Sequence, residues 1–288
     1  MKNILILIRP HQYVKNFFIF LPLFFAGQIL NPALAIKALL AFIAFSFSAS
    51  AIYILNDYYD IAEDRLHPKK KNRPLASGAL SKKTAILLML LLAASGIYLM
   101  FTVSTQATVI LTGYILLNIA YSFYLKHVAI LDISIIAIGF VLRLFVGAAA
   151  TGIYLSMWIV IMTFLLALFL ALAKRRDDVL LFLDTGKRMR KVIDGYNVQF
   201  IDTAMMIMAS VVIVAYISYT TSPEVVQRLH NEHLYLTALF VIIGIMRYMQ
   251  ISFVKQDSGS PTKIILKDIF IQLTLVSWVV AFAWILYL

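Results

Sequence analysis

Apolar residues fill this chain in long runs separated by short polar connections. Runs that approach twenty residues have the length of an α-helix that crosses the hydrocarbon core of a bilayer. The runs do not alternate between apolar and polar positions, as the strands of a membrane barrel do. The pattern therefore predicts an all-α, polytopic membrane protein with nine transmembrane helices, the first interrupted by Pro22 and Gly27. We expect these helices at about 16–33, 36–55, 84–103, 106–124, 129–150, 154–173, 203–221, 233–253 and 264–287.

Composition agrees with a lipid environment, because 62% of the 288 residues are hydrophobic. No long polar linker divides the chain, so we expect a single membrane-embedded domain over 1–288. The absence of cysteine from the sequence excludes a thiol nucleophile, a disulfide framework and a zinc–thiolate site. The sequence leaves the oligomeric state open.

The net charge of +11 is unevenly distributed among the predicted connections. Of 25 Lys and Arg residues, Lys37 and Arg228 follow odd-numbered spans and Arg143 lies inside a span, which leaves 22 around the N-terminus and the even-numbered loops. The positive-inside rule then predicts a multi-pass protein of the cytoplasmic (inner) membrane, with the N-terminus in the cytoplasm and the C-terminus outside. The basic balance thus indicates topology and affinity for anionic groups, with no nucleic-acid partner.

Two of the predicted cytoplasmic loops, 56–83 and 174–202, are long and rich in charge. They follow the second and sixth spans, a spacing that suggests a duplicated four-helix unit. Both loops would open on the same membrane face. We therefore expect one active-site pocket that uses both.

The first loop begins with acids at the end of an apolar helix. Asn56, Asp60 and Asp64 are spaced i, i+4, i+8, and Asp57 joins them, so a helix would place their oxygens in one stripe. Oxygen ligands without nearby histidine or cysteine suit a hard cation. We expect Mg²⁺, with Mn²⁺ as a substitute, held first by Asn56 and Asp60 and next by Asp57 and Asp64.

Lys69, Lys70, Lys71 and Arg73 follow these acids. Such cations are suited to the phosphate charge that a bound Mg²⁺ leaves uncompensated. The alternative is a solvated loop whose acids and bases neutralise each other. Ionisable groups at the end of a membrane helix are costly and usually functional, which favours the site.

The segment "NDYYDIAED" resembles the N-D-x-x-D-x-x-x-D motif of the UbiA superfamily of intramembrane prenyltransferases, and "NRPLASG" resembles the segment that follows it. The resemblance extends over the whole chain in span number and loop placement. It implies a UbiA-like bundle of nine helices with a pocket for Mg²⁺ and diphosphate on the cytoplasmic side.

The second loop departs from that family's pattern. UbiA enzymes carry D-x-x-x-D there, whereas Asp177 and Asp178 are followed four residues later by apolar residues. Lys174, Arg175 and Arg176 stand at the mouth of the sixth span instead. A triplet of cations binds phosphate directly and holds no metal; the alternative is a positive-inside anchor.

Four further segments, "RPHQYVKN", "DRLHPKKKNRP", "YSFYLKH" and "GFVLRLFVGA", resemble one branch of the family, the decaprenyl-phosphate phosphoribosyltransferases. That branch moves 5-phosphoribose from phosphoribosyl diphosphate (PRPP) to a polyprenyl phosphate, as in the synthesis of pentose lipids for the cell envelope. PRPP and the lipid bring three anionic groups into one pocket, which calls for more cations and fewer acids than an allylic diphosphate needs.

The remaining candidates are basic and tyrosine side chains near the ends of the spans, together with Arg143. For those at the ends, the alternative to substrate binding is an anchoring role at the membrane surface. We expect Lys15 to bind the diphosphate or the 5-phosphate, as a catalytic residue beside Asp60 and Asn56. Arg143, inside the fifth span, requires a partner, and we favour an anionic substrate over an internal carboxylate. The other expected substrate-binding residues are Tyr53, Lys70, Arg73, Tyr121, Lys126, Lys174 and Arg175.

Two other functions fit part of the sequence. One is a UbiA prenyltransferase that attaches an isoprenoid to an aromatic ring or quinone precursor. The other is a transporter or flippase for an anionic lipid, since charges at helix ends also line translocation routes. The outer loops offer few cations to receive an anion, which argues against transport.

Overall fold

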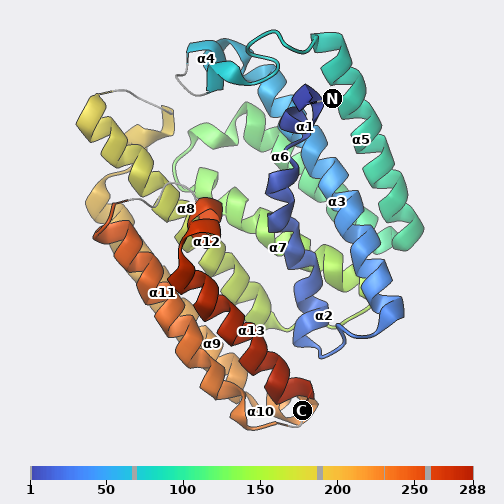
Figure 1. The fold of residues 1–288 in the computed structure, drawn as a ribbon, viewed down its shortest axis with the longest axis vertical. Helices are drawn as coiled ribbons and strands as arrows, with labels where there is room; N and C mark the ends of the chain where they lie inside the picture. The colour runs from blue at the N-terminus through green and yellow to red at the C-terminus, as the bar shows by residue number, and fades with distance from the viewer. Residues whose placement is uncertain (1, 67–69, 187–190, 230, 257–260, 288) are drawn as a thin grey trace. The chain divides into compact units, whose positions relative to one another are not determined.

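The structure is a computed structural model that describes residues 2–66, 70–186, 191–229, 231–256 and 261–287. Within these ranges the chain is helical, without strands, as the sequence predicted (Figure 1). Eight helices of the described part are long and apolar enough to cross a membrane, and they match the second to ninth predicted spans. They are Pro32–Tyr59, Lys82–Val103, Thr105–Phe123, Leu131–Thr151, Met157–Thr185, Val198–Thr221, His233–Phe253 and Ile269–Leu286.

The first predicted span is not one long α-helix. Residues 16–25 of that span belong to the 3₁₀ helix η1 (Pro10–Phe20) and the short helix α2 (Leu21–Phe25), and turns over 26–31 lead into the next helix at Pro32. Arg9 has a left-handed conformation with φ 54°, and Pro10 cannot continue the preceding helix α1 (Lys2–Ile8). The larger rise of a 3₁₀ helix gives η1 and α2 together a length of about 30 Å, enough to cross the hydrocarbon core.

The chain forms two compact units, and α7 (Leu131–Thr151) contributes to both. The first unit contains residues 1–123 and 142–155, and the second contains 124–141 and 156–288. The prediction of a single domain stays a prediction. Besides α1, η1, α2 and part of α7, the first unit contains α3 (Pro32–Tyr59), α4 (Ile61–Leu66), η2 (Lys70–Asn72), α5 (Lys82–Val103) and α6 (Thr105–Phe123).

Small residues let the helices of the first unit approach closely. A Cβ atom added to Gly96 of α5 would lie 2.4 Å from Ser48 Oγ and 2.7 Å from the Ala44 carbonyl oxygen of α3. A Cβ on Gly147 of α7 would lie 2.1 Å from the carbonyl oxygen of Ile19 in η1. Membrane helices gain packing in this way because lipid supplies no hydrophobic force between them. The two glycines therefore seat α5 and η1 in the first unit.

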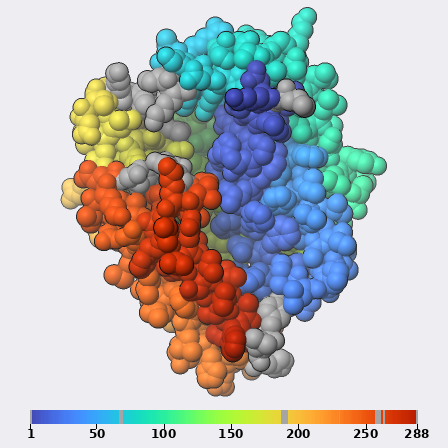
Figure 2. Space-filling model, viewed as in Figure 1, coloured from blue at the N-terminus to red at the C-terminus, as the bar shows by residue number. Residues whose placement is uncertain are grey.

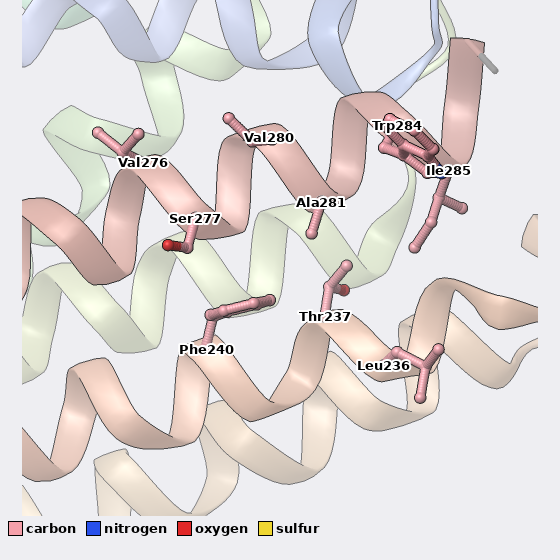
Figure 3. A pocket seen from close by; sticks show the side chains of 9 residues that line it. All are labelled: Leu236, Thr237, Phe240, Val276, Ser277, Val280, Ala281, Trp284 and Ile285. Carbon is pink, nitrogen blue, oxygen red and sulfur yellow. The ribbon is translucent and has the colours of Figure 1, made fainter.

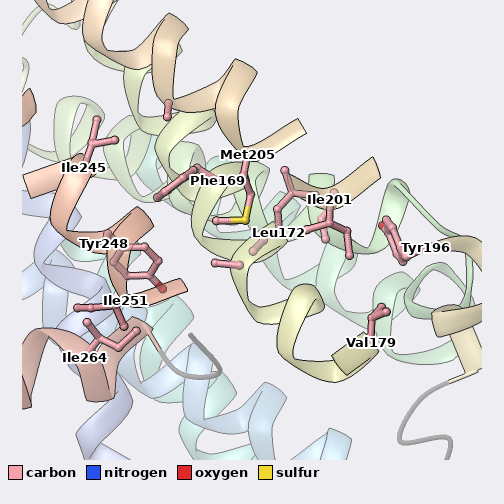
Figure 4. Packing of buried hydrophobic residues seen from close by; sticks show 14 of the residues in the cluster. Phe169, Leu172, Val179, Tyr196, Ile201, Met205, Ile245, Tyr248, Ile251 and Ile264 are labelled. Carbon is pink, nitrogen blue, oxygen red and sulfur yellow. The ribbon is translucent and has the colours of Figure 1, made fainter. Parts of the chain in front are cut away.

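The second unit packs around an apolar core formed mainly by α8, α9 and α11, in which Phe169, Met205 and Tyr248 face one another across the helices (Figure 4). Phe169 and Tyr248 meet edge to face with ring centroids 5.5 Å apart. Besides part of α7, the unit contains η3 (Leu125–His127), α8 (Met157–Thr185), η4 (Lys191–Gly195), α9 (Val198–Thr221), α10 (Pro223–Leu229), η5 (His233–Thr237), α11 (Ala238–Phe253), α12 (Pro261–Lys267) and α13 (Ile269–Tyr287).

A groove of about 490 Å³ separates α13 from η5 and α11 in the second unit (Figure 3). Its lining is apolar apart from the hydroxyls of Thr237 and Ser277, and it contains no ionisable side chain. Apolar residues of α13, among them Val280 and Trp284, are exposed, and the red C-terminal segment lies at the surface of this unit (Figure 2). This surface is therefore suited to lipid tails, and the predicted anion site lies elsewhere.

Candidate functional site

The first loop forms a compact cluster of buried acids and basic side chains at the end of α3. Asp57 and Asp64 are only 2% and 1% exposed. Arg73 Nη1 donates to Asp57 Oδ1 at 3.0 Å and to Asp64 Oδ2 at 2.7 Å. Arg9 from the N-terminal segment also donates to Asp57 Oδ1, and Lys70 Nζ lies 3.8 Å from Asp64 Oδ1. The sequence placed the acids and cations side by side, and the structure brings them together.

The predicted oxygen stripe continues across a short break between two helices. α3 ends at Tyr59, and the Asp60 N–H still donates to the Asn56 carbonyl oxygen at 2.9 Å. The Asp64 N–H donates to the Asp60 carbonyl oxygen at 2.8 Å, so α4 carries the same register onward. Asn56 and Asp60 are half-buried, whereas Asp57 and Asp64 are enclosed by cations.

This arrangement bears on which oxygens suit a metal. Within the described ranges, no three His, Cys, Asp or Glu side chains come together as a metal site. A partly hydrated Mg²⁺ needs only one or two protein carboxylates and completes its shell with water and phosphate. Asn56 and Asp60 meet that requirement. The Asp57 carboxylate forms ion pairs with Arg9 and Arg73, and the Asp64 carboxylate forms one with Arg73. These two acids therefore fix the positions of the guanidinium groups.

Three other predicted residues, Tyr53, Lys15 and Tyr121, belong to the first unit, and Tyr53 contacts Arg9 of this cluster. The ring of Tyr53 lies one turn before Asp57 on α3, with the Arg9 guanidinium 5.3 Å from its centroid. Lys15 is half-buried on η1, the element that follows Arg9. Tyr121 is half-buried near the end of α6. Lys69, also expected to hold phosphate, falls outside the described residues.

Arg143 lies in a separate buried network of the first unit and is 5% exposed. Its Nε donates to Asn16 Oδ1 at 2.9 Å, and its Nη2 donates to Tyr114 Oη at 3.2 Å. The guanidinium also lies over the rings of Phe45 and Tyr114, at 4.9 and 5.1 Å from their centroids. These four groups are neutral and contact the guanidinium through hydrogen bonds and ring faces.

In the second unit, Arg175 and Arg176 point to different neighbours. Arg175 is 1% exposed, and it donates to Asp132 of α7 through Nε and to Asp178 through Nη1. Arg176 pairs with Asp202 of α9 at 2.7 Å and donates to the Ser252 carbonyl oxygen of α11 at 2.8 Å.

The two arginines thus join α8 to α7, α9 and α11. The phosphate contact that we predicted for Arg175 stays a prediction, and the structure gives this side chain internal carboxylate partners. Lys174 and Lys126 are both half-buried, on α8 and in η3. The first loop belongs to the first unit and the second loop to the second unit. The single pocket that we predicted for both loops stays a prediction.

Sequence reasoning missed several partners of the predicted residues. Arg9 pairs with Asp57 across 48 positions of the chain, and Asp132 pairs with Arg175 across 43. Asp132 carried a usable signal, because it is an acid at the start of a membrane span, where charge is costly. Arg9 also stands at the start of one of the segments used for the family resemblance. Tyr196, which donates to Asp132 at 2.6 Å, gave no sequence signal.

Comparison with known proteins gives concordant results. The model of the UbiA prenyltransferase family matches residues 16–277. The decaprenyl-phosphate phosphoribosyltransferase of Corynebacterium glutamicum is 32% identical over 276 residues, which cover 94% of this chain and 83% of the relative. The enzyme of the same name from Mycolicibacterium smegmatis is 30% identical over 282 residues, covering 94% of this chain and 88% of the relative.

A solved structure shares the fold. A UbiA homolog from Archaeoglobus fulgidus, bound to DMAPP and Mg²⁺, superimposes with a TM-score of 0.72. The alignment covers 98% of this chain and 99% of that one, at 19% sequence identity. At this level of identity the comparison shows a shared fold, and the ligands of the solved structure are not transferred to this chain.

Proposed function

Because this chain belongs to the UbiA prenyltransferase family, a family of membrane transferases, we propose a specific reaction for it. The protein transfers 5-phosphoribose from PRPP to a polyprenyl phosphate and releases diphosphate. The reaction takes place at the cytoplasmic side of the inner membrane. The names of the relatives from Corynebacterium and Mycolicibacterium support the choice of donor and acceptor.

One geometric observation carries the choice of PRPP over an allylic diphosphate. Asp178, the acid in the second loop nearest to a metal-binding pattern, is paired with buried Arg175 at 2.8 Å. The position four residues further on is Phe182, so the two acids of a second metal platform do not occur there. In the first loop, in contrast, two buried acids are surrounded by Arg73 and Lys70 of the loop and by Arg9 of the N-terminal segment. A site with more basic and fewer acidic side chains suits a substrate that carries several phosphate groups.

Asn56 and Asp60 are the side chains that would hold Mg²⁺ or Mn²⁺ in this proposal. The bound ion supplies positive charge to the diphosphate that departs from ribose C1. Arg73, Lys70 and Lys15 bind the same diphosphate or the 5-phosphate and orient PRPP. Asp57 and Asp64 keep Arg9 and Arg73 in fixed positions, which lowers the reorganisation needed when charge develops.

The acceptor needs no general base, because a phosphate monoester is already largely ionised near neutral pH. One of its oxygens bonds to ribose C1 as the bond between C1 and the diphosphate oxygen breaks, with both electrons leaving on the diphosphate. The chain's task is to hold the two reactants in line. In this proposal Arg143 binds the lipid phosphate, Lys126 and Tyr121 bind a phosphate group of either substrate, and Tyr53 contacts the ribose or a phosphate.

The proposal is tested by offering the purified protein two donors in parallel. PRPP with a polyprenyl phosphate is compared with an allylic diphosphate and an aromatic acceptor, and acceptor-dependent release of diphosphate is measured. We expect release with PRPP and a requirement for a divalent cation. Release only with the allylic donor would assign the protein to aromatic prenylation, and release with neither would leave lipid transport as the better account.

A further inference from the structure

Tyr196 joins two segments of the second unit through one buried hydroxyl. Its Oη donates to Asp132 Oδ1 at 2.6 Å and accepts a hydrogen bond from the Ile130 N–H at 2.7 Å. The other oxygen of Asp132 accepts from Arg175 Nε. The hydroxyl therefore ties the loop before α9 to the turn before α7, and Arg175 ties the same turn to α8.

The turn that Tyr196 contacts, residues 125–132, is held in an unfavourable backbone conformation. Ile130 has φ 72°, a left-handed value that a β-branched residue rarely adopts. The two segments also approach closely, because a Cβ on Gly195 would lie 2.6 Å from Ala129 Cβ. Strain of this kind persists only where the surroundings impose it, and it clusters at functional sites.

Lys126 lies in this same turn, within η3. We propose that Tyr196 is a positioning residue: its hydroxyl holds the 125–132 turn in its strained conformation and thereby fixes Lys126 to bind a phosphate or diphosphate group. This inference rests on the proposed function for the identity of the anion. Burial and the hydrogen bond to Asp132 raise the pKa of Tyr196 well above its ordinary value, so the hydroxyl stays protonated and remains a donor at neutral pH.

A matched pair of variants separates positioning from general stability. Tyr196→Phe removes the hydroxyl and keeps the ring. Tyr216→Phe is the control, because Tyr216 is also buried in the second unit and its hydroxyl also has two partners, Thr237 Oγ1 and Trp278 Nε1, each at 2.7 Å. Two measurements are made on the full-length protein: amide hydrogen exchange of the peptide around 124–132, and protection of Lys126 from an amine-reactive reagent by inorganic diphosphate.

We expect Tyr196→Phe to speed exchange in the turn and to raise the diphosphate concentration for half-protection of Lys126 at least about tenfold. Tyr216→Phe should change neither. The inference is overturned if exchange rises without a shift in protection, if both variants shift protection equally, or if diphosphate fails to protect Lys126 in the unaltered protein. Protection without phosphoribosyl transfer would contradict the proposed function and leave the role of Tyr196 standing.

Discussion

Asp57 and Asp64 share one guanidinium nitrogen of Arg73, at 3.0 and 2.7 Å from their carboxylate oxygens. The two acids belong to a motif that sequence alone would assign wholly to metal binding. Their burial and their pairing with arginines indicate a division of labour within the motif. We propose that Asn56 and Asp60 hold the metal, whereas Asp57 and Asp64 hold the guanidinium groups of Arg9 and Arg73.

This division predicts different defects for two neighbouring carboxamide substitutions. Asp60→Asn should raise the Mg²⁺ concentration needed for half-maximal activity, because it removes a charged metal ligand. Asp57→Asn should leave the Mg²⁺ requirement near normal and raise KM for PRPP well over tenfold, since weakening a buried charge pair typically costs about 2–5 kcal/mol. Steady-state kinetics over a matrix of Mg²⁺ and PRPP concentrations makes the comparison. Equal shifts in the Mg²⁺ requirement for both variants would contradict the division.

Arg143 offers a test of the lipid phosphate site. Arg143→Met keeps an unbranched, flexible side chain, although a shorter one, and removes its charge. Leaving the Asn16 and Tyr114 groups without the guanidinium should cost at most about 1–3 kcal/mol of unfolding free energy. We expect a folded protein with KM for the polyprenyl phosphate raised over tenfold and KM for PRPP little changed. Unaltered lipid kinetics in this variant would show that the cation serves packing alone.

The glycine contacts predict where added volume is tolerated. Gly147→Ala places a Cβ against the Ile19 carbonyl, so η1 must shift, at a cost of about 1–3 kcal/mol. Gly113→Ala is the control, because nothing lies within 4 Å of the added atom. Thermal unfolding in detergent should show a lower midpoint for Gly147→Ala and an unchanged or higher one for Gly113→Ala. Equal midpoints would mean that η1 is not seated against α7 in this way.

The distribution of cations predicts an orientation that cysteine labelling can measure, because the sequence contains no cysteine. Lys83 lies at the start of α5, and Gln106 lies at the start of α6, just beyond the other end of α5; both side chains are exposed. In intact cells an impermeant thiol reagent should modify Gln106→Cys and leave Lys83→Cys unmodified until the membrane is opened. The reverse pattern would overturn the cytoplasmic placement of the first loop.

The sequence predicted the long helices well, because a membrane span requires a long apolar run and such runs can be read directly along the chain. The exception is the first predicted span, where Pro22 near the start of α2 and Gly27 after its end interrupt a run that hydropathy reads as one segment. The acids from Asp57 to Asp64 were also predictable, since helical spacing is local.

The partners of these residues were not predictable in the same way. Whether Asp57 meets a metal or Arg9 depends on how the N-terminal segment folds back onto α3, a long-range contact that no local pattern encodes. The same holds for Arg175, a cation at a helix end by sequence and a buried partner of Asp132 by structure. Charge patterns thus pointed to the candidate site, and the contacts of each of its residues depend on the fold.

The central claim is that ribose C1 is transferred, with its 5-phosphate, to the lipid phosphate. The most direct measurement uses PRPP labelled either on the 5-phosphate or on the diphosphate, with purified protein, polyprenyl phosphate and Mg²⁺. The account predicts that the 5-phosphate label enters the lipid fraction and that the diphosphate label stays in water as free diphosphate. Diphosphate label in the lipid, or no label in the lipid from either donor, would contradict it.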